Sequence, residues 1–145
     1  MLESLGVDWS RVLDLYAGSG ALGIEALSRG AEWTDFVEQD PRCCAAIKEN
    51  LERVGLVSRA HVYCVSVERS LALLKERYSL VFMDPPYADS SSLRVIEGLA
   101  SSALLGPGTA LVVEHSRRLS LKEEYGPFKL VRNRRHGDTE ISIFQ

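Results

Sequence analysis

The chain has 145 residues, of which 46% are hydrophobic and 26% are charged, and its formal net charge is −3. This composition is typical of a globular domain and excludes an intrinsically disordered chain. No apolar stretch approaches the roughly 20 residues that a membrane-spanning helix needs, and the amino end has no secretory signal pattern. Three cysteines without Cys-x-x-Cys spacing predict reduced thiols in a cytoplasmic protein rather than disulfides or a metal site.

Extended and helical patterns alternate along the chain from one end nearly to the other. Short apolar runs predict buried strands, and apolar positions three or four residues apart predict the helices between them. The expected strands are Arg11–Tyr16, 33–38, 61–65, 80–83 and 109–114. The expected helices begin at the glycine-rich segment after residue 17, at Pro41 with Asp40 as its N-cap, at Val67, and at serines 90–92.

The pattern changes after residue 114. Phe128–Val131 and Ile141–Phe144 predict an antiparallel pair joined by the turn region Asn133–Asp138. Strand–helix alternation followed by such a pair predicts an α/β fold with a mostly parallel, doubly wound sheet and an antiparallel C-terminal hairpin at one edge. No repeat or interdomain linker interrupts the pattern, so residues 1–145 are expected to form a single domain.

The first candidate site is the glycine-rich segment after the first strand. Gly18, Gly20 and Gly23 form a full G-x-G-x-x-G between a strand and a helix, the context in which such a loop binds an adenosine cofactor. Glu38 ends the next strand, where a carboxylate can accept hydrogen bonds from two ribose hydroxyls. Alone, this pattern fits a dinucleotide as well as S-adenosylmethionine. Asp14 favours the methyl donor, because its carboxylate would attract a cationic amino acid moiety and repel a pyrophosphate.

The second candidate site is the tetrapeptide Asp84-Pro85-Pro86-Tyr87, which follows the apolar run 80–83. Its two prolines end the strand, because each lacks an N–H and has a fixed φ. Ligands bind at the carboxyl edge of open α/β sheets. A carboxylate, rigid carbonyls and an aromatic ring at that edge suit chemistry on a flat base that carries an amino group.

The charge distribution offers a third candidate. The acidic net charge argues against nucleic-acid binding through bulk charge, but seven basic residues and only two acidic ones lie from Arg117 to Arg135. A local basic face of this kind can contact phosphates, and Arg132, Arg134 and Arg135 are its candidate nucleic-acid-binding residues. A solvated surface explains the charge equally well.

The first two motifs, in this order, resemble those of class I S-adenosylmethionine-dependent methyltransferases that act on amino nitrogens. A closer resemblance is to the bacterial RsmD family, which methylates guanine N2 in small-subunit ribosomal RNA. It is carried by the segments VLDLYAGSGALGIEALSRGA, FVEQDPRC, LVFMDPPY, GPGTALVVEH and HGDTEISIF, from about Arg11 to Phe144. The resemblance implies a Rossmann-like class I methyltransferase fold, S-adenosylmethionine as donor, and ribosomal RNA or the small ribosomal subunit as partner. It implies a cytoplasmic monomer that needs neither membrane nor metal.

The resemblance also implies roles for individual residues. The donor would be bound by Asp14, Ala17, Gly18 and Gly20 around its methionine part, by Glu38 at the ribose, and by the loop around Ser66 and Val67 at the adenine. Ser19 and Gln39 are further expected cofactor-binding residues. Asp84, Pro85, Pro86 and Tyr87 would form the catalytic group that holds the target base, with Asp84 next to the donor as well. Asp84 and the Pro85 carbonyl would accept the N–H groups of the amine, and Tyr87 would stack on the base.

Two features depart from the family pattern. Ser66 stands where family members usually have an Asp, so the contact to adenine carries no charge. The family also has an amino-terminal extension with a basic segment, whereas the first predicted strand here begins at Arg11. The extension is therefore expected to be absent or truncated.

Two other functions stay open at this point. Asp-Pro-Pro-Tyr also occurs in adenine-N6 DNA methyltransferases, and a basic face meets the phosphates of DNA and RNA alike. A nucleotide-binding or ribosome-assembly module without catalysis would also carry the glycine loop. His115, beside Glu114 at the end of the fifth strand, is expected to be structural.

Overall fold

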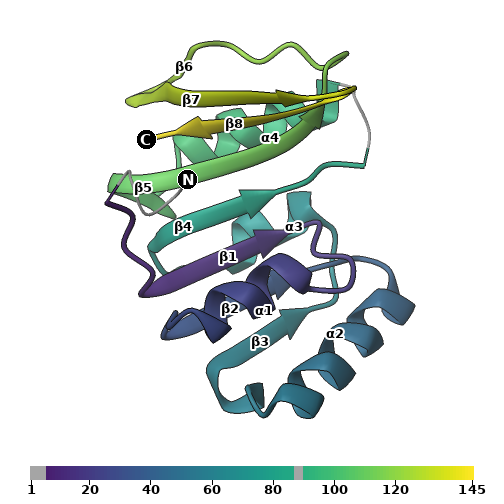
Figure 1. The fold of residues 1–145 in the computed structure, drawn as a ribbon. Helices are drawn as coiled ribbons and strands as arrows, with labels where there is room; N and C mark the ends of the chain where they lie inside the picture. Colours follow the sequence, from purple (N-terminus) through teal and green to yellow (C-terminus); the bar gives the residue numbers. More distant parts are fainter. Residues whose placement is uncertain (1–5, 87–89) are drawn as a thin grey trace.

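The computed structural model describes residues 6–86 and 90–145. The described strands form one sheet in the order β3-β2-β1-β4-β5-β8-β7-β6 (Figure 1). The strands are β1 (Arg11–Leu15), β2 (Trp33–Val37), β3 (Ala60–Tyr63), β4 (Tyr78–Met83), β5 (Leu105–Ser116), β6 (Glu124–Tyr125), β7 (Phe128–His136) and β8 (Thr139–Phe144). The helices are α1 (Ala21–Ser28), α2 (Pro41–Val54), α3 (Val67–Leu73) and α4 (Ser90–Ala100), with a 3₁₀ turn η2 at Val57–Arg59.

The predicted fold class is confirmed. Strands β1 to β5 pair in parallel, and β8 and β7 add an antiparallel hairpin beside β5. Asp40 is the N-cap of α2, because its side chain accepts a hydrogen bond from the Arg42 N–H at 2.9 Å.

The hairpin is longer than predicted. Strand β7 runs to His136 and β8 begins at Thr139, so the expected turn region shrinks to Gly137 and Asp138. Gly137 has a φ of 62°, which suits a two-residue hairpin turn. The exposed, arginine-rich end of β7 has no apolar alternation, and for this reason the sequence pattern did not reveal it as a strand. The strand β6 and the turn η2 were not predicted either.

Of the helices that the structure describes, two cover each face of the sheet. Helices α1 and α2 pack on one face through residues such as Ala26, Ile47 and Leu51, and α3 and α4 pack on the other. In Figure 1, α1 and α2 lie in front of the β1–β3 end of the sheet. The same face of β5, β8 and β7 carries none of the described helices. This asymmetry leaves one part of the face open beside the carboxyl ends of β4 and β5.

The start of α1 packs unusually close to β1 and β2. Gly23 is buried, and a Cβ at this position would overlap the ring of Phe36 and lie 3.0 Å from a carboxylate oxygen of Asp14. The Asp14 carboxyl is buried beneath the helix and accepts a hydrogen bond from the Gly23 N–H at 3.0 Å. Burial raises the pKa of Asp14 to about 8; the Gly23 N–H opposes this rise, and the charges of Asp84 and Glu38 add to it. Glycine is therefore required at position 23 to let helix and strand meet.

We expect Gly23→Ala to lower the thermal unfolding midpoint, because the Phe36 ring is fully buried and has no room to move away. Overpacking of this kind costs about 1–3 kcal/mol. Gly98→Ala is the matched control, since Gly98 also lies inside a helix but its added methyl would meet only Leu71, at 3.4 Å. This control should be neutral or stabilising by up to about 1 kcal/mol. Equal midpoints for the two variants, measured by circular dichroism, would contradict the packing argument.

The raised pKa of Asp14 predicts a pH-dependent stability. In the unfolded chain this carboxyl titrates near its ordinary value of 3.8, whereas the folded chain holds the proton up to about pH 8. The stability that the protonated group contributes is complete below the lower value and is lost as the pH rises through the upper one. We therefore expect Asp14→Asn, which keeps an acceptor for the Gly23 N–H but carries no charge, to weaken the fall of the unfolding midpoint between about pH 5 and pH 9. Exposed Glu52→Gln is the charge-matched control, and an unchanged pH profile in Asp14→Asn would refute the assignment.

Candidate functional site

A cavity of about 650 Å³ opens at the carboxyl edge of β1, β2 and β4. This volume is typical of sites for small molecules and cofactors. Among its lining residues are six that the sequence predicts as site residues: Gly18, Glu38, Gln39, Val67, Asp84 and Pro86. The two candidate sites predicted from separate motifs therefore meet in one cavity.

The glycine-rich loop between β1 and α1 forms one wall. Gly18 and Gly20 have φ values of 59° and 80°, in the left-handed region that favours glycine. The space around Gly18 is open, whereas a Cβ at Gly20 would lie 3.2 Å from atoms of Ile47 and Phe36. The Gly20 N–H closes the loop by donating to the Ala17 carbonyl at 2.8 Å. Gly18 thus leaves room for a ligand, and Gly20 holds the loop against its neighbours.

Glu38 joins this loop to the next one. One oxygen of its carboxylate accepts a hydrogen bond from the Gly18 N–H at 2.8 Å, and the other accepts from the Asp40 N–H at 2.9 Å. A carboxylate has about four lone-pair positions, so each oxygen keeps capacity for one further donor. Because Glu38 also lines the cavity, that capacity is available to a ligand with paired hydroxyl groups.

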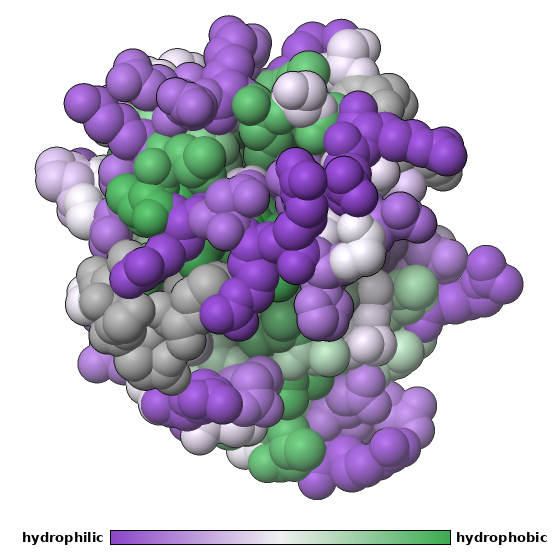
Figure 2. All heavy atoms as spheres, turned by 45° about the horizontal axis from the view of Figure 1, so that its top comes forward, coloured by the Kyte–Doolittle hydropathy of each residue, from purple (hydrophilic) through white to green (hydrophobic). Residues whose placement is uncertain are grey.

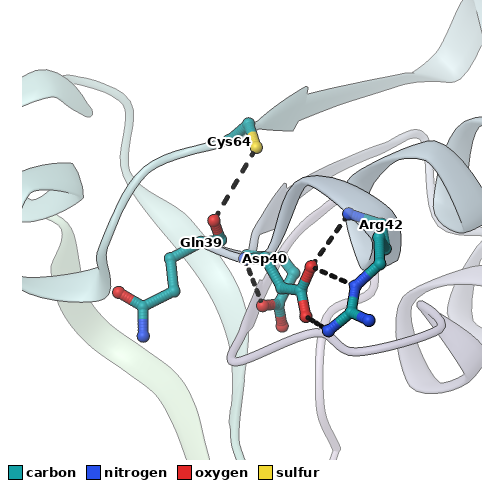
Figure 3. A network of polar contacts seen from close by, with 5 residues as sticks. Gln39, Asp40, Arg42 and Cys64 are labelled. Carbon is teal, nitrogen blue, oxygen red and sulfur yellow. Dashed lines mark hydrogen bonds and ion pairs between the residues drawn. The ribbon is translucent and has the colours of Figure 1, made fainter.

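The turn after Glu38 is supported by backbone and thiol contacts. The thiol of buried Cys44 donates to the Glu38 carbonyl at 3.1 Å, and that of exposed Cys64 approaches the Gln39 carbonyl at 4.0 Å. Burial is the main cause that raises the pKa of Cys44, to about 12, so this thiol stays protonated at neutral pH. Figure 3 shows the Gln39 side chain extending away from the paired Asp40 and Arg42. The predicted reduced, structural thiols thus hold the backbone on which Glu38 and Gln39 sit.

The two predicted residues at the start of α3, Ser66 and Val67, have different positions relative to the cavity. Ser66 is the N-cap of α3, because its hydroxyl oxygen accepts a hydrogen bond from the Arg69 N–H at 3.2 Å. The hydroxyl proton remains available to a ligand. Val67 is buried and lines the cavity, with Glu68 beside it. An apolar side chain can pack on the face of a planar ring, and a carboxylate beside it can accept a hydrogen bond from the edge of the ring.

Asp84 follows β4 directly and lines the cavity together with Pro86. The Asp84 residue is exposed, yet partial removal of its carboxyl from water raises its pKa, and the Glu114 carboxylate raises it further. Tyr87, the last residue of the predicted catalytic tetrapeptide, lies outside the described residues. A carboxylate with a raised pKa accepts protons more readily than an ordinary aspartate.

Some predicted residues lie near the cavity without lining it. These are Asp14, Ala17, Ser19, Gly20, Ser66 and Pro85. The structure also adds six lining residues that were not predicted as site residues: Tyr16, Asp40, Cys43, Glu68, Ser91 and Ser92. Tyr16 has a φ of 57°, which is uncommon for a residue other than glycine. Its position at the carboxyl end of the predicted strand Arg11–Tyr16 was the signal that could have identified it.

The three predicted arginines of β7 do not form one group. Cross-strand register pairs Arg132 with Ile143 and Arg134 with Ile141, so these two arginines share a face of the sheet. Arg135 lies on the opposite face and forms an ion pair with Glu140 at 3.2 Å. Figure 2, in which the β6–β8 edge of Figure 1 comes forward, shows hydrophilic side chains around separate apolar patches.

His115 is structural, as predicted. Its ring is buried, with Nε2 lying 2.8 Å from the Ser142 hydroxyl and Nδ1 lying 3.0 Å from the Ser116 carbonyl.

Within residues 6–86 and 90–145, no group of three or more His, Cys, Asp or Glu side chains is arranged to hold a metal ion. No helix in the described part of the chain has the length and apolar character needed to cross a membrane.

The family described as "Conserved hypothetical protein 95" matches residues 1–145. YlbH of Bacillus subtilis (strain 168) is 36% identical over 141 residues, which cover 95% of this chain and 77% of YlbH. The ribosomal RNA small subunit methyltransferase D of Haemophilus influenzae is 34% identical over 110 residues, which cover 72% of this chain and 56% of that protein. The chain thus spans little more than half the length of that relative.

Solved structures agree with these sequence matches. A conserved hypothetical protein from Streptococcus pyogenes has a TM-score of 0.87 at 34% identity, covering 92% of this chain and 84% of that one. A ribosomal protein L11 methylase from Lactobacillus delbrueckii subsp. bulgaricus, at 19% identity and a TM-score of 0.81, shares the fold. Because the family match spans the whole chain and the fold agrees, the chain belongs to the Conserved hypothetical protein 95 family, and is an RsmD-like methyltransferase with the class I methyltransferase fold.

Proposed function

We propose that this protein transfers a methyl group from S-adenosylmethionine to the exocyclic N2 amine of a guanine in small-subunit ribosomal RNA. The observation that carries the proposal is that Gly18 and Glu38, from the glycine-loop side, line the same cavity as Asp84. A small-subunit ribosomal RNA methyltransferase is among the relatives of the chain, which supports the choice of RNA as the methyl acceptor.

The glycine-loop side of the cavity fits the proposed donor. The open space around Gly18 admits close approach of a ligand, and the free acceptor capacity of Glu38 suits the two ribose hydroxyls. Val67 would pack against the adenine, with Gln39 and Ser66 near its edge. Asp14 would act from beneath the loop, where a cationic group bound above it would favour the ionised form of this otherwise protonated carboxyl. S-adenosylmethionine, when bound, supplies a methyl group on a positively charged sulfur.

Asp84 would organise the acceptor. The exocyclic amine of guanine is a weak nucleophile, because its lone pair is delocalised into the ring. Hydrogen bonds from its N–H groups to the Asp84 carboxylate and the Pro85 carbonyl favour a pyramidal nitrogen, and its lone pair then points at the methyl group. The new N–C bond forms as the C–S bond breaks, and the electron pair of that bond stays on sulfur. The amine loses one proton, and Asp84, which lines the cavity and has a raised pKa, would accept it.

Arg132 and Arg134 would contact the phosphates of the RNA. Continuing the β4–β5 register past Met83 and Val113 places Asp84 beside Glu114, and cross-strand pairs join Glu114 to Ile141 and Ile141 to Arg134. Strands lie about 4.8 Å apart, so this row spans roughly 14 Å. That distance allows an arginine to bind a backbone phosphate while the target base reaches the cavity.

We expect Asp84→Ala to reduce methyl transfer at least about 100-fold, because it removes the acceptor of the amine protons. The variant should still bind S-adenosylhomocysteine in calorimetry with the affinity of the wild type. Transfer of labelled methyl groups to small ribosomal subunits, naked ribosomal RNA and duplex DNA identifies the polymer, and mass spectrometry of the nucleosides identifies the base.

The outcomes of this experiment separate the candidate functions. Modified N2-methylguanosine in RNA supports the proposal, and N6-methyladenine in DNA favours the DNA enzyme instead. Binding of S-adenosylhomocysteine without transfer to any polymer would favour the non-catalytic module. Full turnover by Asp84→Ala would remove Asp84 from the mechanism.

We expect the double variant Arg132→Gln/Arg134→Gln to weaken RNA binding and to make it less sensitive to salt. Each lost phosphate contact should reduce the slope of log K against log salt by about 0.7–1. Arg53→Gln, whose arginine is paired with Glu49 on α2, is the charge-matched control and should leave the slope unchanged. Arg135→Gln should have a smaller effect than the double variant, because its guanidinium is already paired. An unchanged slope in the double variant would place the RNA elsewhere.

A further inference from the structure

Glu114 lies directly beside Asp84 at the carboxyl edge of the sheet. Phe82 pairs with Val112 and Met83 with Val113, so the next pair along these parallel strands is Asp84 and Glu114. Phe82 and Val112 both pack on the face that α1 and α2 cover. Because side chains alternate along a strand, the residues two positions further on are directed to that same face.

The surroundings of Glu114 give it no partner of its own. Within the described part of the chain its carboxylate, which is half-buried, forms no hydrogen bond and no ion pair. The neighbouring polar groups of the strand pair are already engaged, His115 with Ser142 and Glu140 with Asn133 and Arg135. A carboxylate that is partly removed from water and left without a donor is costly, unless a ligand supplies one.

The Watson–Crick edge of guanine offers two adjacent donors, the N1–H and the N2 amine. Adenine offers an amine beside an N1 that accepts hydrogen bonds and would be repelled by a carboxylate. Ionised carboxylates only accept hydrogen bonds, so two of them side by side match guanine and mismatch adenine. Bases that leave their helix are recognised in this way, by hydrogen bonds to their Watson–Crick edge.

We propose that Glu114 is a specificity-determining residue that accepts the N1–H of the target guanine, while Asp84 binds its N2 amine. The inference rests on the proposed function and adds to it the reason why guanine is chosen over adenine. The close approach of the two carboxylates is unfavourable while the site is empty, because like charges repel; the pKa of Asp84 is raised mainly by its partial removal from water and further by the Glu114 carboxylate. A base that donates to both carboxylates relieves this repulsion, and a base with only one donor relieves less of it.

The test compares guanine with 2-aminopurine, which keeps the amine at C2 but has an N1 that accepts hydrogen bonds. The modified position is first located in small-subunit RNA that the wild-type protein has methylated. A synthetic segment that carries either base at that position is then ligated into the RNA. The kcat/KM values for both RNAs are measured with the wild type, with Glu114→Gln and with the exposed control Glu52→Gln.

We expect the wild type and Glu52→Gln to prefer guanine by at least about 100-fold, because the analogue leaves the Glu114 carboxylate facing an acceptor. Glu114→Gln should reduce that preference at least about tenfold, since its amide can donate to N1 of 2-aminopurine. The O6 atom that 2-aminopurine lacks affects all three proteins alike and cancels in the comparison. Affinity for S-adenosylhomocysteine and the unfolding midpoint should stay unchanged, which a merely structural role of Glu114 would not predict.

A preference for guanine in Glu114→Gln equal to that of the wild type would overturn the role of Glu114 and leave the proposed function intact. Absence of N2-methylguanosine from RNA treated with the wild type would instead overturn the proposed function itself. The two failures are therefore distinguishable.

Discussion

The close contact between Asp14, Gly23 and Phe36 determines the geometry of the cavity. The first turn of α1 packs directly on the Phe36 ring of β2, because Gly23 has no side chain. The buried Asp14 carboxyl accepts a hydrogen bond from the Gly23 N–H. This contact fixes how far the start of α1 lies from β1, and therefore the path of the glycine loop that joins them. Within that loop Gly18 has a left-handed backbone, and its N–H donates to Glu38. The fold thus uses an acid that prefers to be neutral to position a loop that faces solvent.

The sheet separates the two kinds of charge that the molecule presents. Acidic side chains gather where β2, β4 and β5 end, and the unpaired arginines of the described β7 strand lie two strands beyond β5 on the same face. A polyanion would be repelled at the first position and attracted at the second. Such an arrangement favours a ligand whose backbone stays outside while one neutral base reaches inside. It also explains how a protein with a net charge of −3 can recruit a nucleic acid.

Sequence reasoning identified strands β1 to β5, the helices between them and half of the described residues that line the cavity, because glycine, proline and apolar periodicity act locally. It expected Asp14 to contact the donor but could not reveal that this carboxyl is buried under the loop, since the depth of a strand residue depends on how tightly the next helix packs. It grouped Arg135 with Arg132 and Arg134, which only the register of β7 against β8 separates. Glu114 was read with His115 as the end of a strand, because its neighbour Asp84 lies far away in the sequence.

The two backbone hydrogen bonds of Glu38 make scaffold and ligand contact inseparable at this residue. The same carboxylate that faces the cavity ties the β1–α1 loop to the β2–α2 turn. Ligand binding and loop ordering are thermodynamically linked at this carboxylate. The affinity for a molecule that hydrogen-bonds to its remaining lone pairs therefore depends also on how well ordered the two loops are. The affinity lost on substituting Glu38 would therefore combine the loss of the ligand contact with the disordering of the two loops. The free energy of the ligand contact alone can be measured only by changing the ligand, removing one hydroxyl at a time.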